Sequence, residues 1–249
     1  MLSKNKIKNI RALHITKYRK ERKLFIVETP KVVSEFLHSS FVVKEIFATD
    51  NWLENELSVQ GIPINRITEK ELHSISALTN ANQVFALVQI PDYANIKFNA
   101  QELILALDTI QDPGNMGTII RIADWFGIKK IVCSKESADV YNPKVVQASM
   151  GALSRIQIHY TELVPWLSQQ DATTPIYGTL LNGEDIYSQE LSQRGIIIIG
   201  NESKGINPMV QNMLSHSIRI PSYGNSKMES LNAAIATAIV CAEFKRPKR

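Results

Sequence analysis

Cysteine is scarce in this sequence: only Cys133 and Cys241 occur among 249 residues. Two thiols cannot form a disulfide framework or a cysteine-based metal cluster, which excludes small disulfide-rich folds and zinc fingers. No apolar run reaches the about 18 residues of a membrane-spanning helix, and the N-terminus has no apolar signal-peptide core. We therefore expect a cytoplasmic globular protein with no membrane partner.

The motifs of several large enzyme classes are missing as well. The chain has no G-x-G-x-x-G after the first strand of a predicted domain, no G-x-x-x-x-G-K-[ST] and no G-x-S-x-G. Dinucleotide binding, P-loop nucleotide hydrolysis and α/β-hydrolase chemistry are therefore not predicted. The few histidines show no metal-binding spacing, so we predict no metal site. They are His14, His38, His73, His159 and His216.

Positive charge is concentrated at the two ends of the chain. Residues 1–23 contain nine Lys and Arg against one Glu, and residues 245–249 contain four more. Of the 28 Lys and Arg, 15 remain for residues 24–244, which hold 23 acidic residues. Clustered cations release counterions from nucleic-acid phosphates, so this pattern predicts a polyanionic partner. A solvated helix face with a solubilising tail is the alternative that the charges alone leave open.

The order of predicted elements indicates two α/β domains. In the first, the predicted strands are 23–28, 41–49, 63–67 and 83–90, and the predicted helices are 29–39, 51–60 and 69–77. A Thr cap and a Pro at the first helical position mark the start of the helix at 29–39. The segment 91–101 begins with Pro and has no period, so it is the predicted linker. We therefore place a smaller domain at residues 1–98 and a larger one at 99–249.

The larger domain is predicted to contain a parallel sheet covered by helices on both faces. Its strands are almost continuously apolar, as in "GIIIIG", which is typical of such sheets. The predicted strands are 102–108, 129–134, 155–160, 175–180, 195–200 and 217–222, and the helices lie near 115–126, 143–153, 161–169 and 229–244. Ligands of open parallel sheets bind beyond the carboxyl ends of the strands, so the loops there form the candidate site.

Two of these loops carry polar residues in unusual places. The segment "TIQDPGNMGTIIRIADWFG" (109–127) has Asn115 near a helix start and Arg121 on the same helix. An N-cap Asn with a surface Arg is the structural alternative. The segment "NESKGI" (201–206) has Glu202 directly after a buried strand, where a carboxylate needs a partner or a ligand. An ordinary polar turn is the alternative there.

The third loop, "IPSYGNSKMESLNAAIATAIV" (220–240), places Ser230 and Asn232 just before an alanine-rich helix. A plain helix cap, a phosphate loop and one wall of a cofactor pocket are all compatible with this stretch. Exposed backbone N–H groups at a helix start can bind polar ligand atoms. The small side chains that follow favour close packing of this helix in a core or a subunit interface.

In this order and at these spacings, the three segments resemble the three motifs of the SpoU (TrmH) family of RNA ribose methyltransferases, within the SPOUT superfamily. The matching stretches are "NMGTIIRIADWFG", "IIIIGNESKGI" and "IRIPSYGNSKMESLNAAIATAI", and "SADVYNPKVVQASMGALSRIQI" resembles the connecting segment. The resemblance covers residues 102–244. The stretch "RKERKLFIVETPKVVSEFL" resembles the ribosomal-protein-like RNA-binding domain of the rRNA-directed branch.

The resemblance implies a homodimer that transfers a methyl group from S-adenosylmethionine to a ribose 2′-hydroxyl of RNA, without a metal. It also implies a trefoil knot in the larger domain. The implied catalytic residues are Asn115, Arg121, Glu202, Ser230 and Asn232. The implied lining of the cofactor pocket, largely through backbone groups, is Thr179, Leu180, Gly200, Ile220 and Leu231. The RNA-binding residues expected at the basic N-terminus are Lys8, Arg11, Lys17, Arg19, Lys20 and Arg22.

Two features depart from the family pattern. Ser203 stands where many members have Gly, and the loop from Pro221 to Ser230 is longer than the common form. Both bear on the cofactor contacts rather than on the catalytic set.

The implied chemistry needs in-line placement of the ribose oxygen and help in removing its proton. Arg121 is the base that the resemblance implies, although a guanidinium with a pKa above about 12 stays protonated. Transient deprotonation in a special pocket is one role for it. We favour the other, stabilisation of the developing alkoxide and the adjacent phosphate. Glu202 would then orient Arg121, while Asn115 and Asn232 would fix the ribose and the guanidinium.

Ribosomal RNA is the expected substrate, because short tRNA-directed members often lack the N-terminal domain. The same reaction on tRNA is the nearest alternative. A base-methylating enzyme of the same superfamily and a non-catalytic RNA-binding ribosome-assembly factor are alternatives of other classes. The matched polar residues favour a ribose methyltransferase over both.

Overall fold

The computed structural model describes residues 1–54, 59, 61–92, 101–224 and 230–247. The chain forms two compact units. Unit 1 comprises Met1–Asp92 and Asp139–Arg155, and unit 2 comprises Tyr93–Ala138 and Ile156–Arg249. The predicted boundary between residues 98 and 99 lies outside the described residues, as does much of the predicted helix 51–60. Among the helices of the described residues, none has both the length and the apolarity to cross a membrane.

Unit 1 is built on a four-stranded mixed sheet in the order β1-β4-β2-β3. Its strands are β1 (Leu24–Glu28), β2 (Val43–Ala48), β3 (Ile64–Arg66) and β4 (Val84–Gln89). Strand β4 runs antiparallel to β1 and β2, and β3 runs parallel to β2. All four predicted strands are therefore present. The helices before residue 92 are α1 (Lys4–Ala12), α2 (Thr16–Arg22), α3 (Pro30–Leu37), α4 (Asp50–Leu53) and α5 (Glu69–Ile75).

The basic N-terminus folds into α1 and α2, which the sequence analysis did not predict as helices. Ser3 caps α1 by accepting a hydrogen bond of 3.2 Å from the Lys6 backbone N–H. Ile10 and Leu13 are buried in the core of unit 1, beside Ile75 at the end of α5. The apolar spacing of three residues thus gives α1 one buried face and leaves its other face to basic side chains.

The start of α3 differs from the predicted Thr cap. Thr29 occupies the N-cap position, but its side chain makes no capping hydrogen bond. Its backbone has φ of 77°, which is rare for a β-branched residue. The prediction of a helix with Pro30 at its first position is confirmed, whereas the predicted capping interaction is wrong.

The segment 139–155 belongs to unit 1, although the sequence places it between strands of unit 2. It contains α7 (Pro143–Ala148) and the short 3₁₀ helix η1 (Ala152–Ser154). The ring of Tyr141 lies 4.7 Å from that of Phe25 in β1. Arg155 forms an ion pair with Glu35 of α3. Aromatic packing and charge pairing therefore attach both ends of this segment to the sheet and helices of unit 1.

Unit 2 contains the predicted parallel sheet, with six strands in the order β10-β8-β9-β5-β6-β7. Its strands are β5 (Leu103–Leu107), β6 (Lys130–Ser134), β7 (Gln157–Thr161), β8 (Ile176–Asp185), β9 (Gly195–Ile199) and β10 (His216–Arg219). Every pairing in this sheet is parallel. Its helices are α6 (Pro113–Trp125), α8 (Leu163–Ser168), η2 (Ile186–Ser188), α9 (Pro208–Gln211) and α10 (Ala233–Phe244).

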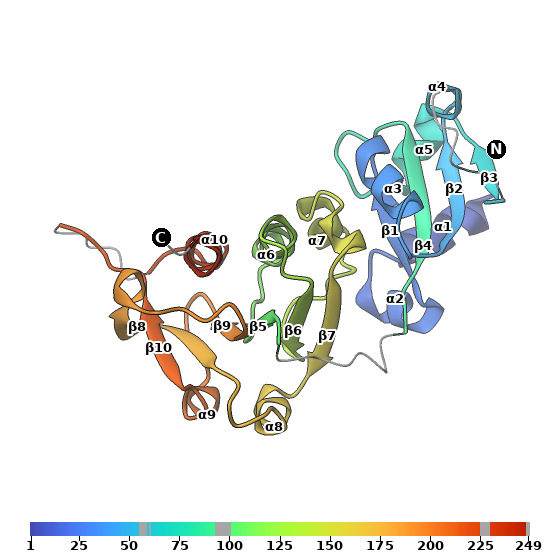
Figure 1. Cartoon of the computed structure of the whole chain (residues 1–249). Coiled ribbons are helices and arrows are strands. Elements are labelled where there is room, and N and C mark those ends of the chain that lie inside the picture. The colour runs from blue at the N-terminus through green and yellow to red at the C-terminus, as the bar shows by residue number, and fades with distance from the viewer. Residues whose placement is uncertain (55–58, 60, 93–100, 225–229, 248–249) are drawn as a thin grey trace. The chain divides into compact units, whose positions relative to one another are not determined.

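Helices cover both faces of this sheet. Figure 1 shows α6 and α10 on one face and α8 and α9 on the other. Ile104, Ile196 and Ile198 are fully buried in the central strands and pack in one core cluster with Trp166 of α8. The near-continuous apolar strands thus have the two-sided burial that their sequences predict.

Candidate active site

The first candidate loop positions Asn115 one turn inside helix α6. Asp112 is the N-cap, and its Oδ1 accepts a hydrogen bond of 2.7 Å from the Asn115 backbone N–H. Pro113 occupies the first helical turn, where its missing N–H costs nothing. The alternative in which Asn115 is itself the N-cap is therefore wrong. Because Asp112 caps the helix, the Asn115 side chain is available for other contacts.

Side chains from all three candidate loops join in one hydrogen-bonded chain. Asn115 Nδ2 donates to Glu202 Oε1 at 2.8 Å, and Asn232 Nδ2 donates to Asn115 Oδ1 at 2.9 Å. A carboxylate can only accept, so Glu202 fixes which end of the Asn115 amide is the donor. The Asn115 oxygen must then accept from Asn232. Three residues far apart in the sequence thus orient one another at the carboxyl edge of the sheet.

Asn232 serves this chain and the helix cap at the same time. Its Oδ1 accepts hydrogen bonds of 2.9 and 3.3 Å from the backbone N–H groups of Ala234 and Ile235. Its Nδ2 is thereby directed away from the helix, toward Asn115. The helix-cap interpretation of this stretch is therefore confirmed, and the same amide also bonds to Asn115.

Glu202 sits on a tight loop that folds back on itself. The backbones of Asn201 and Gly205 exchange two hydrogen bonds of 3.0 and 2.9 Å. A Cβ on Gly200 would lie 2.4 Å from the Gly205 carbonyl carbon, so no side chain fits at residue 200. Asn201 Oδ1 accepts from the N–H groups of Ser203 and Lys204, both at 2.9 Å. Because the loop satisfies these amides internally, they do not form a phosphate cradle.

Two further polar residues, which the sequence analysis did not single out, connect the first two loops. Asn201 Nδ2 donates to the Thr109 carbonyl oxygen at 2.8 Å. Asp108 is buried at the end of β5, and its Oδ2 accepts from the Asn207 N–H at 2.7 Å. Each of the two follows a buried strand, Asp108 directly after β5 and Asn201 soon after β9, and this position was the signal in the sequence that could have identified them. These bonds hold the loop of Glu202 beside the loop that leads into α6.

Arg121 and Ser230 do not join this hydrogen-bonded chain. At about 100° per residue, the six positions from Asn115 to Arg121 turn the helix by about 240°, so the two side chains leave α6 on different faces. Arg121 is exposed and forms no hydrogen bond or ion pair with the described part of the chain. The expected pairing of Glu202 with Arg121 is absent, because Glu202 accepts from Asn115 instead. Ser230 is exposed just before the capping Asn232.

The predicted cofactor-lining residues come from three adjacent strands, β8, β9 and β10, and from the start of α10. Consecutive residues Ser217 and Ile218 of β10 pair with Gly178 and Glu184 of β8, so residues 179–183 bulge out of that ladder. Thr179 and Leu180 are in this bulge, Gly200 and Ile220 directly follow β9 and β10, and Leu231 precedes the Asn232 cap. The bulge frees backbone donors and acceptors at this edge, which suits a pocket lined by main-chain groups.

Neither cysteine of unit 2 is equipped as a nucleophile. Cys133 in β6 and Cys241 in α10 are both buried. Burial raises the pKa of the Cys241 thiol to about 12 and raises the pKa of Cys133 as well. Both side chains are therefore neutral thiols at physiological pH.

Comparison with known proteins identifies the family. The model of the SpoU rRNA methylase family matches residues 102–242, which include the whole hydrogen-bonded chain of Asn115, Glu202 and Asn232. The chain belongs to the SpoU rRNA methylase family. A second model, the MRM3-like substrate-binding domain, matches residues 4–86 of this SpoU chain. The trefoil knot that the sequence resemblance implies stays a prediction.

Relatives of this SpoU chain cover nearly all of it. The 23S rRNA (guanosine(2553)-2'-O)-methyltransferase RlmP of Bacillus subtilis (strain 168) is 30% identical over 238 residues, with 94% of each chain covered. A solved structure assigned to the TrmH family of RNA methyltransferases, from Porphyromonas gingivalis, is 38% identical, with a TM-score of 0.90 and 98% of each chain covered. An AdoMet-bound rRNA methyltransferase from Sinorhizobium meliloti is 29% identical, with a TM-score of 0.87 and coverage of 98% of this chain and 95% of that one.

The predicted RNA-binding residues of unit 1 fall into two groups. Five of them are exposed on α1 and α2: Lys8, Arg11, Lys17, Lys20 and Arg22. Arg19 is the exception, because its side chain is only 1% exposed and is paired with Asp139 at 2.6 Å. A guanidinium buried in this way cannot reach a phosphate. The prediction that Arg19 binds RNA directly is therefore wrong.

Proposed function

We propose that this protein transfers a methyl group from S-adenosylmethionine to a ribose 2′-hydroxyl of RNA, with ribosomal RNA as the substrate. The hydrogen-bonded chain of Asn232, Asn115 and Glu202 carries this proposal, because it assembles residues of all three SpoU motifs at one sheet edge. RlmP, a 23S rRNA 2'-O-methyltransferase, is similar over both units. That similarity favours rRNA over tRNA.

In this proposal, some side chains orient the ribose and another stabilises negative charge. Asn115 and Asn232 hold the ribose in a fixed orientation, with the negative end of their chain at Glu202. Arg121, which is exposed and uncommitted to the described residues, is available to the RNA. Its guanidinium stabilises the alkoxide that develops at O2′ and binds the neighbouring phosphate. Ser230 lies at the same loop and assists in positioning the ribose.

S-adenosylmethionine, when bound, supplies an electrophilic methyl group on a positively charged sulfur. The residues that would hold it are Thr179, Leu180, Gly200, Ile220 and Leu231, through the backbone groups freed at the β8 bulge and at the ends of β9 and β10. None of these residues carries a charge, which suits a cofactor held through shape and main-chain hydrogen bonds. Metal-free transfer is part of the proposal.

We further propose that the protein acts in the cytoplasm as a homodimer. Helix α10 is apolar around its circumference, and such helices are normally buried on all sides. Here Ile235 of α10 is 55% exposed and Trp125 of the neighbouring α6 is 85% exposed. A second copy would cover these side chains. Sedimentation velocity should give a dimer for the wild type and a shift toward monomer for Ile235→Glu.

Transfer of labelled methyl groups tests the enzymatic proposal. The protein is incubated with labelled S-adenosylmethionine and total RNA that lacks modifications, and the rRNA and tRNA fractions are separated and counted. We expect label in rRNA. Label in tRNA alone would replace the substrate, and label in neither would favour the non-catalytic RNA-binding factor.

A further inference from the structure

Helix α2 carries much of the basic surface of unit 1, and its last residue, Arg22, donates to the Asn9 carbonyl oxygen of α1 at 2.7 Å. It is seven residues long, from Thr16 to Arg22, and its N-cap residue, Ile15, makes no side-chain capping hydrogen bond. Isolated helices of this length are unstable in water, so α2 depends on tertiary contacts. Its only buried residue among the seven is Arg19. The exposed cations Lys17, Lys20 and Arg22 are therefore positioned by a helix that one buried arginine anchors.

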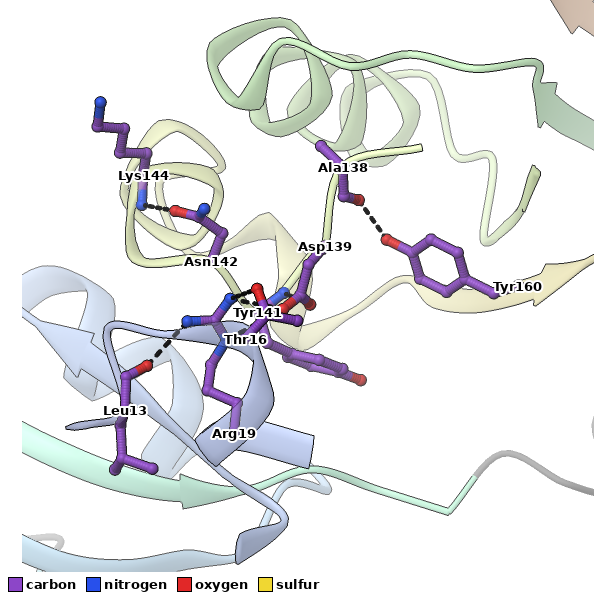
Figure 2. Close-up of polar contacts among 9 residues, drawn as sticks. All are labelled: Leu13, Thr16, Arg19, Ala138, Asp139, Tyr141, Asn142, Lys144 and Tyr160. Atoms are coloured by element: carbon purple, nitrogen blue, oxygen red, sulfur yellow. Dashed lines mark hydrogen bonds and ion pairs between the residues drawn. The ribbon is translucent and has the colours of Figure 1, made fainter. Parts of the chain in front are cut away.

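All three nitrogens of the Arg19 guanidinium donate hydrogen bonds within unit 1 (Figure 2). Its Nε and Nη2 both donate to Asp139 Oδ2, at 3.0 and 2.6 Å. Nη1 donates to the Leu13 carbonyl oxygen at 2.8 Å, and Nη2 also donates to Thr16 Oγ1 at 2.9 Å. Thr16 is the first residue of α2 and Leu13 follows α1. One side chain thus ties both basic helices to a single carboxylate.

Asp139 is itself held in a fixed orientation by its neighbours along the chain. Its Oδ1 accepts a hydrogen bond of 3.0 Å from the Tyr141 N–H, which leaves Oδ2 for Arg19. The preceding residue, Ala138, is bound within unit 2. Its N–H donates to the Ile110 carbonyl oxygen at 2.8 Å, and its carbonyl oxygen accepts from Tyr160 Oη. Ile110 lies in the loop that leads into α6, and Asp139 is the next residue along the chain after Ala138.

We infer that Arg19 and Asp139 are a positioning pair for the RNA substrate. The pair fixes the cations of α2 to the chain segment that continues into the catalytic sheet, and neither residue touches RNA itself. The test of this inference by KM rests on the proposed methyltransferase function. The test by RNA binding does not depend on that function.

The test compares Asp139→Asn with wild type on unmodified rRNA transcripts. We expect KM for rRNA to rise about fivefold or more, with kcat and S-adenosylmethionine affinity within twofold. Removal of an acidic charge alone would strengthen attraction to RNA. If Asp139→Asn binds RNA more weakly, the change is opposite to the one expected from its charge. Such a result would therefore show that the Arg19–Asp139 pair positions the RNA-binding cations. Arg19→Lys should behave similarly, because an ammonium cannot reproduce the planar fork.

Glu35→Gln is the matched control. It removes the ion pair of Glu35 with Arg155, which attaches the same segment 139–155 to α3 but not to the basic helices. KM for rRNA should be unchanged in this variant. Equal effects in Glu35→Gln and Asp139→Asn, or a joint loss of kcat, cofactor affinity and thermal stability, would show a merely structural role and overturn the inference. An unchanged KM in Asp139→Asn would also overturn it.

Two further measurements cover the cases in which a variant does not fold or the wild type transfers no methyl group. Removing one partner of an ion pair whose other partner is buried is strongly destabilising, so Asp139→Glu replaces Asp139→Asn if the latter does not fold. If the wild type transfers no methyl group, the proposed function fails, and fluorescence anisotropy with the same labelled rRNA transcript decides the inference. Asp139→Asn or Asp139→Glu must then bind that transcript about fivefold or more weakly than wild type. Equal binding would refute the positioning role.

Discussion

Asn115 donates a hydrogen bond of 2.8 Å to Glu202, a residue 87 positions later in the chain. This bond fixes the orientation of the Asn115 side chain at the start of α6, because the Glu202 carboxylate accepts from its nitrogen and Asn232 donates to its oxygen. Because Glu202 accepts from Asn115, it does not orient Arg121 as the sequence analysis expected. The chemistry proposed for the site therefore divides into an orienting chain and a separate cation, and each part can be tested alone.

Glu202→Gln and Glu202→Ala distinguish a hydrogen-bond role from a charge role. The Gln side chain keeps an acceptor oxygen for Asn115, so we expect kcat for methyl transfer to stay within a few-fold of wild type. The Ala side chain removes the acceptor of a charge-assisted bond worth about 1.5–3 kcal/mol, which predicts a loss of about 10- to 100-fold. Single-turnover kinetics measure both. Equal losses in the two variants would mean that the negative charge, rather than the bond to Asn115, is what transfer requires.

Asn232→Asp separates the helix cap from the active site. Asp is as good an N-cap as Asn, so the cap of α10 and the melting temperature should be preserved. The variant has no Nδ2 donor for Asn115 and places a second carboxylate near Glu202. We therefore expect methyl transfer to fall at least about tenfold, because one oriented hydrogen bond is lost.

Asn232→Ala is the companion variant. It should lose activity to a similar degree and also about 1 kcal/mol of stability through the lost cap. Calorimetry and transfer assays on both variants check this separation. Wild-type activity in Asn232→Asp would contradict the role of the Asn232–Asn115 bond.

Arg121→Lys tests the proposed stabilisation of the alkoxide and phosphate. A lysine keeps the charge but loses the planar, bidentate guanidinium. We expect kcat to fall about 100-fold, as for other groups that stabilise a developing oxyanion, with the affinity for S-adenosylmethionine unchanged. Isothermal titration calorimetry with S-adenosylmethionine gives the cofactor affinity, and single-turnover methyl transfer gives the rate of the chemical step. Near wild-type turnover would exclude bidentate positioning by Arg121.

The exposed cations of α2 should set part of the salt dependence of RNA binding. Replacement of Lys17 and Lys20 by Gln removes up to two phosphate contacts, which should lower the slope of log K against log salt by about 0.7–0.9 for each contact. Lys6→Gln is the control, because Lys6 is already paired with Glu45 at 2.6 Å. Cofactor affinity should stay constant in all variants. A slope unchanged by Lys17→Gln with Lys20→Gln would place the RNA footprint elsewhere.

Glu28 should make unit 1 less stable as pH rises. It is a buried carboxyl, and burial raises its pKa above the ordinary value of 4.5, despite hydrogen bonds from Ser76 and Ala77. In the folded state the protonated form is favoured, so its stabilising contribution is present below pH 4.5 and is lost as pH rises through the folded pKa. Glu28→Gln cannot lose a proton. The melting temperature of wild type relative to Glu28→Gln should therefore fall as pH rises above 4.5, and a difference independent of pH would contradict the assignment.

The sequence predicted the elements of both sheets well, because their strands are short apolar runs with clear ends. It also predicted which three loops would meet, since these follow buried strands of one parallel sheet. It did not predict that Glu202 pairs with Asn115 rather than Arg121, because this pairing depends on where the loop of Glu202 lies, and long-range contacts such as that of Asn201 with Thr109 fix that position. It also could not show that Arg19 is buried, because Asp139, its partner, is 120 positions away. Basic residues on a short helix look alike in sequence whether they contact RNA or a partly buried carboxylate such as Asp139.

The position of the transferred methyl group tests the central claim most directly. Unmodified rRNA is incubated with the protein and S-adenosylmethionine, hydrolysed in alkali, and sequenced for linkages that resist cleavage. The proposed function predicts one or a few resistant linkages, which are present with wild type and lost with Arg121→Lys. A methylated base with no resistant linkage, or no modification of any RNA, would contradict it.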